Sequence, residues 1–294
     1  MDTRDTFEEY RPLLFSLAYR MTGTAGEAED IVQDAYLRYR GASDAEVRSL
    51  KAYLTTIVTR LSLDYLKSAR ARREQYFGEW LPEPLLTAGD EAPLPLETLE
   101  QRETISLAFL ALLEYLTPQE RAVFLLRDIF DYDYAEIASM LGLSTANCRQ
   151  LLHRARERLA EKRQRFEPSP EQQRQLTERF LAATQDGDLA ALTDLLAADV
   201  VVHGDGGGKV PAIARPLAGR EPVMKFLIGI ARKALAGVTI TMAEVNGGQA
   251  MLIWMEAQLY AVFALEFDGD RISRFYNVLN PDKLAYIARQ LGTV

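Results

Sequence analysis

The sequence has very few of the residues that form disulfides or bind transition metals. It contains one cysteine, Cys148, and two histidines, His153 and His203. A single cysteine cannot form an intrachain disulfide, and these three residues do not follow the spacing of a metal-binding motif. We therefore expect no disulfide, no metal ion and no other cofactor.

Long apolar stretches are also missing. No run approaches the roughly 20 apolar residues that a membrane-spanning helix needs. The acidic start, MDTRDTFEEY, does not have the pattern of a signal peptide. Together with the lone cysteine, these absences favour a cytoplasmic protein with no membrane partner.

Residues 76–100, which we call the linker, contain six acidic side chains and no basic one. Pro82, Pro84, Pro93 and Pro95 prevent a continuous helix and favour extended backbone. At about 3.1 Å per residue, the linker could extend to about 75 Å. Its charge should repel DNA, but the stretch WLPEPL (80–85) is too apolar to remain in water. We expect another surface to cover it.

Basic side chains are concentrated on either side of the linker. They occur in KSARARR (67–73) and in the run from Arg154 to Arg165. Local patches matter more for nucleic-acid binding than the total, so a net charge of −8 does not exclude it.

Residues 6–75 have the three-to-four spacing of amphipathic helices. In one helix Ile31, Val32 and Ala35, with Tyr36 and Tyr39, form the predicted buried face. In the next helix that face comprises Leu50, Tyr53, Leu54, Ile57, Leu61, Tyr65 and Leu66.

The stretch DYAEIASMLGLSTANCRQLLHRARERL (133–159) predicts a helix-turn-helix. Ala138 is the small residue at the helix crossing, Gly142 allows the turn, and Ser144 can cap the second helix. Ile137, Leu141, Leu143, Cys148 and Leu151 would seal the angle, which makes Cys148 a core residue. The second helix would then present polar side chains to a major groove.

The chain after EPSPEQ (167–172) predicts an α+β domain with a mostly antiparallel sheet. Two helices over about 171–196 lead into DVVVH (199–203), and GREPVMKFLIGIARKAL (219–235) predicts another helix. Strand patterns follow in VTITMAEV (238–245), QAMLIWMEA (249–257), YAVFALEF (260–267) and RISRFYNVL (271–279), separated by turn signals.

Several stretches together resemble the extracytoplasmic-function sigma factors of bacterial RNA polymerase. They are AEDIVQDAYLRYR, LDYLKSARARR and the long stretch from Leu116 to Leu159. WLPEPL, DGGGK (205–209) and NPDKL (280–284) resemble the subgroup with a fused SnoaL-like domain. The resemblance implies a multidomain protein of all-α regions 2 and 4 followed by a cone-shaped SnoaL/NTF2-like α+β domain. The expected boundaries are 5–75 for region 2, 76–100 for the linker, 101–166 for region 4 and 170–294 for the SnoaL-like domain.

The resemblance also implies where core RNA polymerase and promoter DNA bind. The polymerase clamp would contact Asp30, Gln33, Asp34, Leu37 and Arg38. The −10 element would contact Arg60, Asp64, Lys67 and Arg70, with Arg72 and Arg73 from the same basic run, although many members have asparagine where this chain has Arg60. The −35 element would contact Thr145, Ala146, Asn147, Arg149, Gln150, His153, Arg154 and Arg156. Tyr53 and Tyr65 could stack on an unpaired base, but their spacing fits the core as well.

The glycine-rich run GDGGGKV (204–210) does not fit a phosphate-binding loop. Aligning Gly208 and Lys209 with that motif puts His203 at its first glycine and Val210 at its hydroxyl residue. We expect instead an exposed loop whose glycines allow positive φ angles and close approach to another segment. The expected regulatory contact within the chain joins Trp80, Leu81, Pro82 and Leu85 to Asp205, Gly206, Gly207, Gly208 and Lys209 and to Asn280, Asp282 and Lys283.

Three functions remain open for the C-terminal domain. It could regulate the sigma regions, or sense a small molecule in a pocket lined by Trp254, Met255, Phe263 and Tyr276. It could also be an enzyme in which His203 pairs with an aspartate such as Asp205, but a lone histidine makes catalysis the least favoured. We expect a non-enzymatic initiation factor. The alternative is a two-domain transcriptional regulator whose C-terminal domain senses a small molecule.

Overall fold

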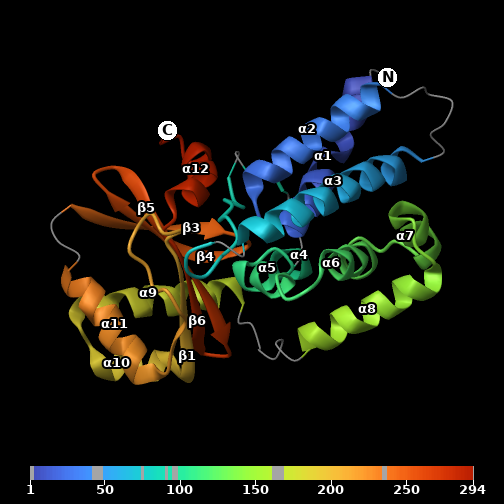
Figure 1. Cartoon of the computed structure of the whole chain (residues 1–294). Coiled ribbons are helices and arrows are strands. Elements are labelled where there is room, and N and C mark those ends of the chain that lie inside the picture. The colour runs from blue at the N-terminus through green and yellow to red at the C-terminus, as the bar shows by residue number, and fades with distance from the viewer. Residues whose placement is uncertain are drawn as a thin grey trace. The chain divides into compact units, whose positions relative to one another are not determined.

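The protein forms two compact units in the computed structural model, which describes residues 3–41, 49–73, 76–89, 92–94, 99–160, 169–233 and 237–293 (Figure 1). The first unit comprises Met1–Gln75, Pro93–Pro95 and Phe109–Arg163. The second comprises Tyr76–Ala92, Leu96–Ala108 and Gln164–Val294. Most of the linker therefore belongs to the same unit as the C-terminal domain. The other unit contains the predicted region 2 and the predicted region 4 from Phe109 onward.

Three helices form the N-terminal part of the first unit: α1 (Thr3–Thr22), α2 (Ala25–Arg40) and α3 (Leu50–Arg73). As the spacing predicts, Ile31, Val32 and Ala35 of α2 are buried, and so is Leu54 of α3. Tyr36 and Tyr39 are half-buried and pack their rings against Phe7 of α1. The buried faces of the three helices thus form one core.

The helix-turn-helix lies in the same unit. Along the chain it is preceded by α4 (Leu99–Glu103), which belongs to the second unit, and then by α5 (Leu107–Leu113), α6 (Pro118–Phe124) and a π-helical turn, η2 (Leu125–Ile129). Its two helices are α7 (Tyr134–Leu141) and α8 (Thr145–Ala160). Gly142 ends α7 with a left-handed φ of 66°, which glycine adopts without steric cost.

The second unit contains a six-stranded sheet in the order β2-β1-β6-β5-β4-β3. The strands are β1 (Leu196–Asp205), β2 (Leu217–Ala218), β3 (Val238–Val245), β4 (Gly248–Met255), β5 (Gln258–Asp268) and β6 (Arg271–Val278). Strand β1 pairs with β6 in parallel, and the other pairs are antiparallel. The predicted α+β domain with a mostly antiparallel sheet is confirmed.

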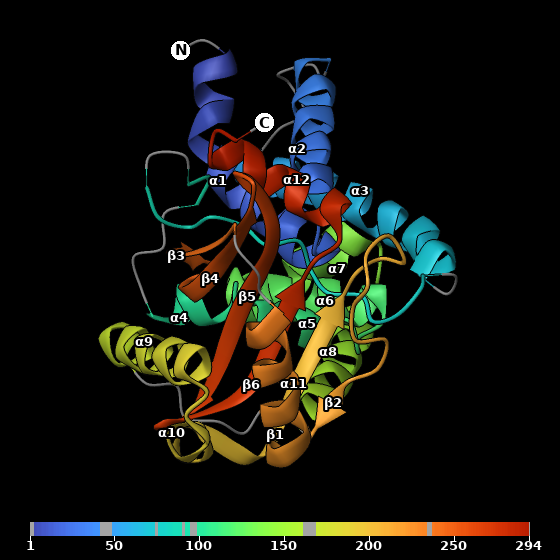
Figure 2. The same cartoon turned by 90° about the vertical axis from the view of Figure 1, so that its left-hand side faces the viewer.

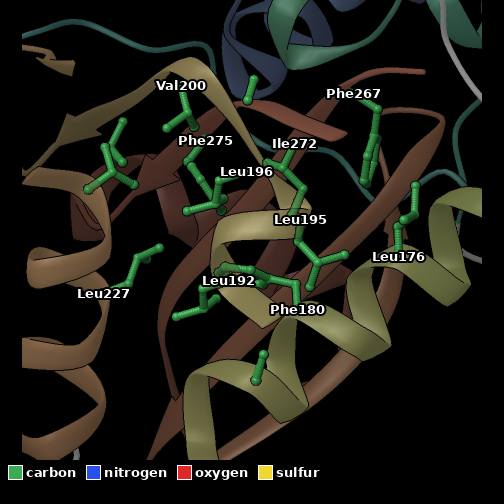
Figure 3. Packing of buried hydrophobic residues seen from close by; sticks show 14 of the residues in the cluster. Leu176, Phe180, Leu192, Leu195, Leu196, Val200, Leu227, Phe267, Ile272 and Phe275 are labelled. Carbon is green, nitrogen blue, oxygen red and sulfur yellow. The ribbon is translucent and has the colours of Figure 1, made fainter. Parts of the chain in front are cut away.

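Helices α9 (Pro170–Asp186), α10 (Leu189–Leu195) and α11 (Arg220–Lys233) cover one face of this sheet, and α12 (Pro281–Gln290) follows β6 (Figure 2). Leu176 and Phe180 of α9 pack with Phe275 of β6 in the buried cluster, which Figure 3 shows from close by. The sheet and these helices enclose the core that positions the C-terminal site.

Candidate functional site

The surface of α2 carries the residues predicted to bind polymerase. Ile31, Val32 and Ala35 bury one face of α2 in the core, so the opposite face points to solvent. It exposes Asp30, Gln33, Asp34, Leu37 and Arg38. Leu37 is 55% exposed and is the apolar member of this otherwise polar surface.

The second helix of the helix-turn-helix, α8, places its predicted DNA contacts on one side. Ser144 caps it, since the Ser144 hydroxyl accepts the N–H of Asn147 at 3.1 Å. Cys148 is buried, and this burial raises the pKa of its thiol, as expected for a core residue. The side chains of Ala146, Asn147, Arg149, Gln150, His153, Arg154 and Arg156 are exposed, and Thr145 is half-exposed.

Three of these side chains have partners within the chain, and His153 lies 3.4 Å from Glu157 on the same helix. The Arg156 guanidinium forms a bidentate pair with Asp128, with N–O distances of 2.7 and 2.9 Å. Arg149 lies over the ring of Tyr134, 5.0 Å from its centroid. The contacts of Arg156 and Arg149 hold these two arginine side chains in defined orientations on the exposed surface.

Helix α3 carries the residues predicted to contact the −10 element. Arg60, Asp64 and Lys67 are exposed, and Lys67 pairs with Asp64 at 2.8 Å. The side chains of Arg70, Arg72 and Arg73 lie outside the described residues. Tyr53 and Tyr65 are half-buried, which is compatible with packing in the core and with stacking on an unpaired base.

The same helix contacts the helix-turn-helix directly. Arg60 Nε donates to the carbonyl oxygen of Met140 in α7 at 3.1 Å. The hydroxyls of Thr55 and Tyr132 lie 2.8 Å apart in a buried hydrogen bond. Helix α3, which carries the predicted −10 surface, therefore packs against α7 of the helix-turn-helix within one unit.

In the second unit, Asp205 is the centre of a buried polar network. Its side chain is fully buried, so the prediction of an exposed Asp205–Lys209 loop is wrong at this residue, and only Gly208 and Lys209 are exposed. Its carboxylate accepts hydrogen bonds from the Tyr76 hydroxyl at 2.5 Å and from the Leu81 N–H at 2.8 Å. Burial and this bond to Asp205 raise the pKa of Tyr76, so the hydroxyl keeps its proton.

Lys283 of α12 supplies the positive charge of this network. Its Nζ lies 2.6 Å from Asp205 Oδ2 and also donates to the Leu81 carbonyl. The same ammonium lies 4.0 Å from the centroid of the Trp80 ring. Pro82 and Leu85 are buried beside these contacts. Asp205 binds the N–H of Leu81 and Lys283 binds its carbonyl oxygen, and together they hold the linker against the C-terminal domain.

The glycines of this segment allow its close approach to α12 and to the linker. Gly207 and Gly208 have φ angles of 59° and 71°. A Cβ on Gly207 would lie 2.3 Å from Asn280 Nδ2, and one on Gly206 would lie 2.3 Å from the Val210 carbonyl oxygen. The predicted need for positive φ and close contact is confirmed.

Two further contacts connect the glycine segment to the start of α12. Asn280 donates from Nδ2 to the Tyr76 hydroxyl at 2.8 Å, and its Oδ1 caps α12 through the Asp282 N–H. Lys209 and Asp282 form an exposed ion pair at 2.6 Å. The three predicted stretches, WLPEPL, DGGGK and NPDKL, are brought together in one place.

A second attachment of the linker involves residues that the sequence did not reveal. Asn246 at the β3–β4 turn accepts the Leu85 N–H at 2.9 Å through its side chain and donates its own N–H to the Leu85 carbonyl. Gln290 of α12 accepts the Leu86 N–H at 2.9 Å. Leu86 also pairs with Val245, so the linker extends the edge of the sheet beyond β3.

His203 does not pair with Asp205. Its Nδ1 lies 2.8 Å from Glu79 of the linker, and its ring stacks on Tyr276 at 5.1 Å between centroids. Tyr276 is buried and hydrogen-bonds to Glu266, and its burial together with that negative charge raises its pKa well above the usual value. The histidine–aspartate pair, the least favoured of the three possibilities for this domain, is therefore absent from the described residues.

The C-terminal domain contains a cavity of about 410 Å³ between the sheet, α9 and α11. Phe263 lines it as predicted, but Trp254, Met255 and Tyr276 do not. Trp254 donates to the Thr241 hydroxyl, and Met255 is exposed. Met251, Ile253 and Asn277 line the cavity in place of these three residues.

Among the described residues, no three acidic, histidine or cysteine side chains come together as a metal site. In the same part of the chain, no helix has the length and apolar character needed to cross a membrane.

Comparison with known proteins connects these surfaces to transcription. Residues 6–72 match the family model Sigma-70 region 2, and residues 106–159 match Sigma-70, region 4. The chain is 37% identical over 287 residues to the ECF RNA polymerase sigma factor SigJ of Mycobacterium tuberculosis, covering 94% of this chain and 91% of that protein. It is 32% identical over 286 residues to the probable factor SigI of the same species, covering 96% and 95%.

The crystal structure of M. tuberculosis SigJ is similar to this chain along nearly its whole length. The alignment has a TM-score of 0.78 at 33% identity and covers 96% of this chain and 98% of that chain. The similarity therefore extends through the linker and the C-terminal domain.

Proposed function

The chain belongs to the extracytoplasmic-function sigma factors and carries a C-terminal SnoaL-like domain, and we propose that this domain controls the factor by binding its linker. As a member of this family the protein binds core RNA polymerase and directs it to promoters. The observation that carries the proposal is the buried carboxylate of Asp205, which accepts hydrogen bonds from Tyr76 and Leu81 of the linker. We place this activity in the cytoplasm, where the bacterial polymerase works.

The exposed residues of α2, from Asp30 to Arg38, are the proposed polymerase contact. The exposed side of α8 is the proposed reader of the −35 element, because Arg149 and Gln150 can pair with base edges. The exposed side of α3, with Arg60 and Lys67, is the proposed contact of the −10 element. Arginine and lysine there supply the charge that phosphates require.

Linker binding restrains these surfaces for a geometric reason. Two promoter elements about two helical turns apart are separated by about 70 Å. A linker held at Leu81 by Asp205 and at Leu85 by Asn246 cannot extend over that distance. Contacts between α3 and the helix-turn-helix, including Thr55 with Tyr132, must also break. We infer that release of the linker precedes full promoter engagement.

The decisive experiment compares three proteins: the full chain, a chain ending at Ser169, and the full chain with Asp205→Asn. Promoter-directed transcription by core polymerase and the affinity for core polymerase are measured for each. We expect Asp205→Asn to raise promoter output several-fold while the protein stays folded. Unchanged output and unchanged affinity in both variants would remove the regulatory role.

A catalytic role of the C-terminal domain is not part of the proposal. His203 pairs with the linker residue Glu79 and stacks on Tyr276. A histidine engaged in this way stabilises the linker contact instead of activating a substrate. A two-domain regulator without polymerase binding is not favoured by the family matches, and co-purification with core polymerase distinguishes it.

A small-molecule sensor is the second candidate function for this domain. The specific observation in its favour is the cavity of about 410 Å³, whose lining is mainly apolar. Sensing and linker control are compatible, because both would use the same domain.

A further inference from the structure

The cavity in the C-terminal domain has the size and the lining of a site for a small organic molecule. Its volume of about 410 Å³ lies within the range of such sites. Phe180 of α9 and Leu227 of α11 line it on the helical side, and Ile253, Ala261 and Phe263 line it on the sheet. When such a cavity is empty, the side chains that line it lack packing partners. An apolar molecule that fills it restores those contacts and stabilises the folded protein.

Four polar side chains interrupt this lining, Thr184, Gln185, Tyr260 and Asn277, and of these four only Asn277 is buried. Asn277 of β6 is only 6% exposed, and its Oδ1 is buried without a hydrogen-bond partner among the described residues. Its neighbours across the sheet are Gly204 and Phe263, neither of which has a polar side chain. A buried amide oxygen left in this state costs about 1–3 kcal/mol. A leucine at this position would avoid that cost, so stability of the domain does not account for an asparagine here.

The rest of the lining indicates what the partner of this amide is. The lining contains no charged side chain among the described residues. The Thr184 hydroxyl, at the same cavity, already donates to the Phe180 carbonyl at 2.8 Å. An ion would therefore lose its hydration without gaining a counter-charge. A neutral molecule with one hydrogen-bonding group loses much less.

We propose that this cavity binds an uncharged, mainly apolar small molecule whose single hydrogen-bonding group pairs with the amide of Asn277. The site deepens the sensor function proposed above, but the binding itself does not depend on linker control. The amide can donate or accept, so hydroxyl and amine groups are both suitable.

Strand β6 connects this site to the linker network. Leu279, two residues after Asn277, also lines the cavity. The backbone N–H groups of Leu279 and Asn280 both donate to the carbonyl oxygen of Asp205, at 2.8 and 2.9 Å. The side chain of that same Asp205 accepts the Leu81 N–H. A ligand that shifts the end of β6 therefore moves the residue that holds the linker.

Binding can be tested with N-phenyl-1-naphthylamine, a neutral molecule with two aromatic groups and one N–H, whose fluorescence rises in apolar surroundings. We expect saturable binding of one probe per full-length chain. Asn277→Leu should weaken the probe about three- to ten-fold, since one hydrogen bond is lost. The same substitution should raise the melting temperature of the ligand-free protein, which a purely structural asparagine would not do.

A pair of matched variants locates the probe. Ala261→Phe places a large side chain in the cavity and should abolish binding, whereas Ala182→Phe, on the exposed side of α9, should leave it unchanged. Competition gives the charge preference: 1-octanol should displace the probe at a concentration at least ten-fold lower than octanoate. No saturable binding, as for a cavity that holds water only, would overturn the proposal. So would binding that is insensitive to Ala261→Phe, or equal displacement by octanoate.

Hydrogen exchange of the linker amides tests the connection separately. The probe should change the exchange rate of the Leu81 amide several-fold in the full chain, and should have no effect in Ala261→Phe. Probe binding without any change at Leu81 would leave the ligand site standing and overturn its connection to the linker.

Discussion

The ammonium group of Lys283 lies 2.6 Å from Oδ2 of Asp205, and the two side chains are 7% and 0% exposed. Such a buried pair is tolerated only when the remaining hydrogen-bonding capacity of both groups is used. The linker uses most of it, through Tyr76 and the backbone of Leu81, and the ring of Trp80 lies against the ammonium. The Gly207 N–H also donates to Asp205. The charged pair and the linker therefore depend on each other.

The first prediction concerns the charge of Asp205. Asp205→Asn leaves the Lys283 ammonium buried without a carboxylate, which costs about 3–5 kcal/mol for such pairs. We expect faster hydrogen exchange at the Leu81 amide, which mass spectrometry of the linker peptide measures. Asp268→Asn removes an exposed carboxylate from the same domain and serves as the control. Equal exchange in both variants would contradict the role of Asp205.

The second prediction separates close contact from backbone strain. Gly207 and Gly269 share a φ of 59°, but only Gly207 has neighbours where a Cβ would lie. Gly207→Ala and Gly269→Ala should both carry the left-handed strain of about 1–2 kcal/mol. Only Gly207→Ala should also displace Asn280 and alter promoter output. Similar output from the two variants would show that the contact at Gly207 has no effect on the factor.

The third prediction concerns the exposed pair of Lys209 and Asp282. Lys209→Glu replaces attraction by repulsion next to α12 and should raise promoter output with the domains still folded. The side chains are 54% and 65% exposed, so solvent screening limits the effect to about 1 kcal/mol, or about five-fold. The double variant Lys209→Glu, Asp282→Lys should restore the original output. Failure of this restoration at low salt would exclude the pair as the cause.

The fourth prediction concerns the contact between α3 and the helix-turn-helix. Tyr132→Phe removes the buried hydrogen bond to Thr55, which stabilises the packed arrangement by about 1 kcal/mol. We expect promoter output at limiting polymerase to rise by up to about five-fold. Tyr10→Phe removes a tyrosine hydroxyl from α1 of the same unit and is the control. A decrease in output for Tyr132→Phe would mean that the packed arrangement favours initiation.

The fifth prediction concerns recognition of the −35 element. Arg149→Ala and Gln150→Ala should each reduce holoenzyme binding to the promoter by about 5- to 150-fold, the range for losing a good base contact. The loss should disappear on a promoter whose −35 element is scrambled. Equal losses on both promoters would indicate phosphate contacts without base recognition.

Local patterns predicted the elements that depend on neighbouring residues. The turn at Gly142 and the cap at Ser144 are decided within a few residues of sequence, and both occur as predicted. The strand at Val238–Val245 also follows from its own alternation. Helix caps and strand faces have such short-range causes, so a single sequence reveals them.

The linker network depends on contacts that no local pattern encodes. Asp205 lies in a run of glycines that looks like an exposed loop, yet Lys283, 78 residues away, makes its burial favourable. Asn246 stands in an Asn-Gly-Gly turn signal, where its φ of 53° is expected, but its side chain reaches Leu85, 161 residues away. Pairings over such distances are set by the tertiary fold.

The cavity lining shows that a shift of one residue in a strand changes which side chains point to the cavity. Phe275, Asn277 and Leu279 share the face toward the helices, so Tyr276 points the other way and stacks on His203. A β-bulge between Ile253 and Trp254 interrupts the alternation of β4. Of the three aromatic residues predicted to line the pocket, Phe263 lines it, whereas Trp254 and Tyr276 do not.

The linker is bound along the C-terminal domain from Tyr76 to Thr87, and this has a consequence for how the factor behaves in a cell. The linker and its binding surface belong to one chain, so they meet at an effective concentration in the millimolar range. Dilution, expression level and the supply of a second protein do not alter that value. A molecule or partner that changes the surface itself is then required to change the fraction of chains with a free linker.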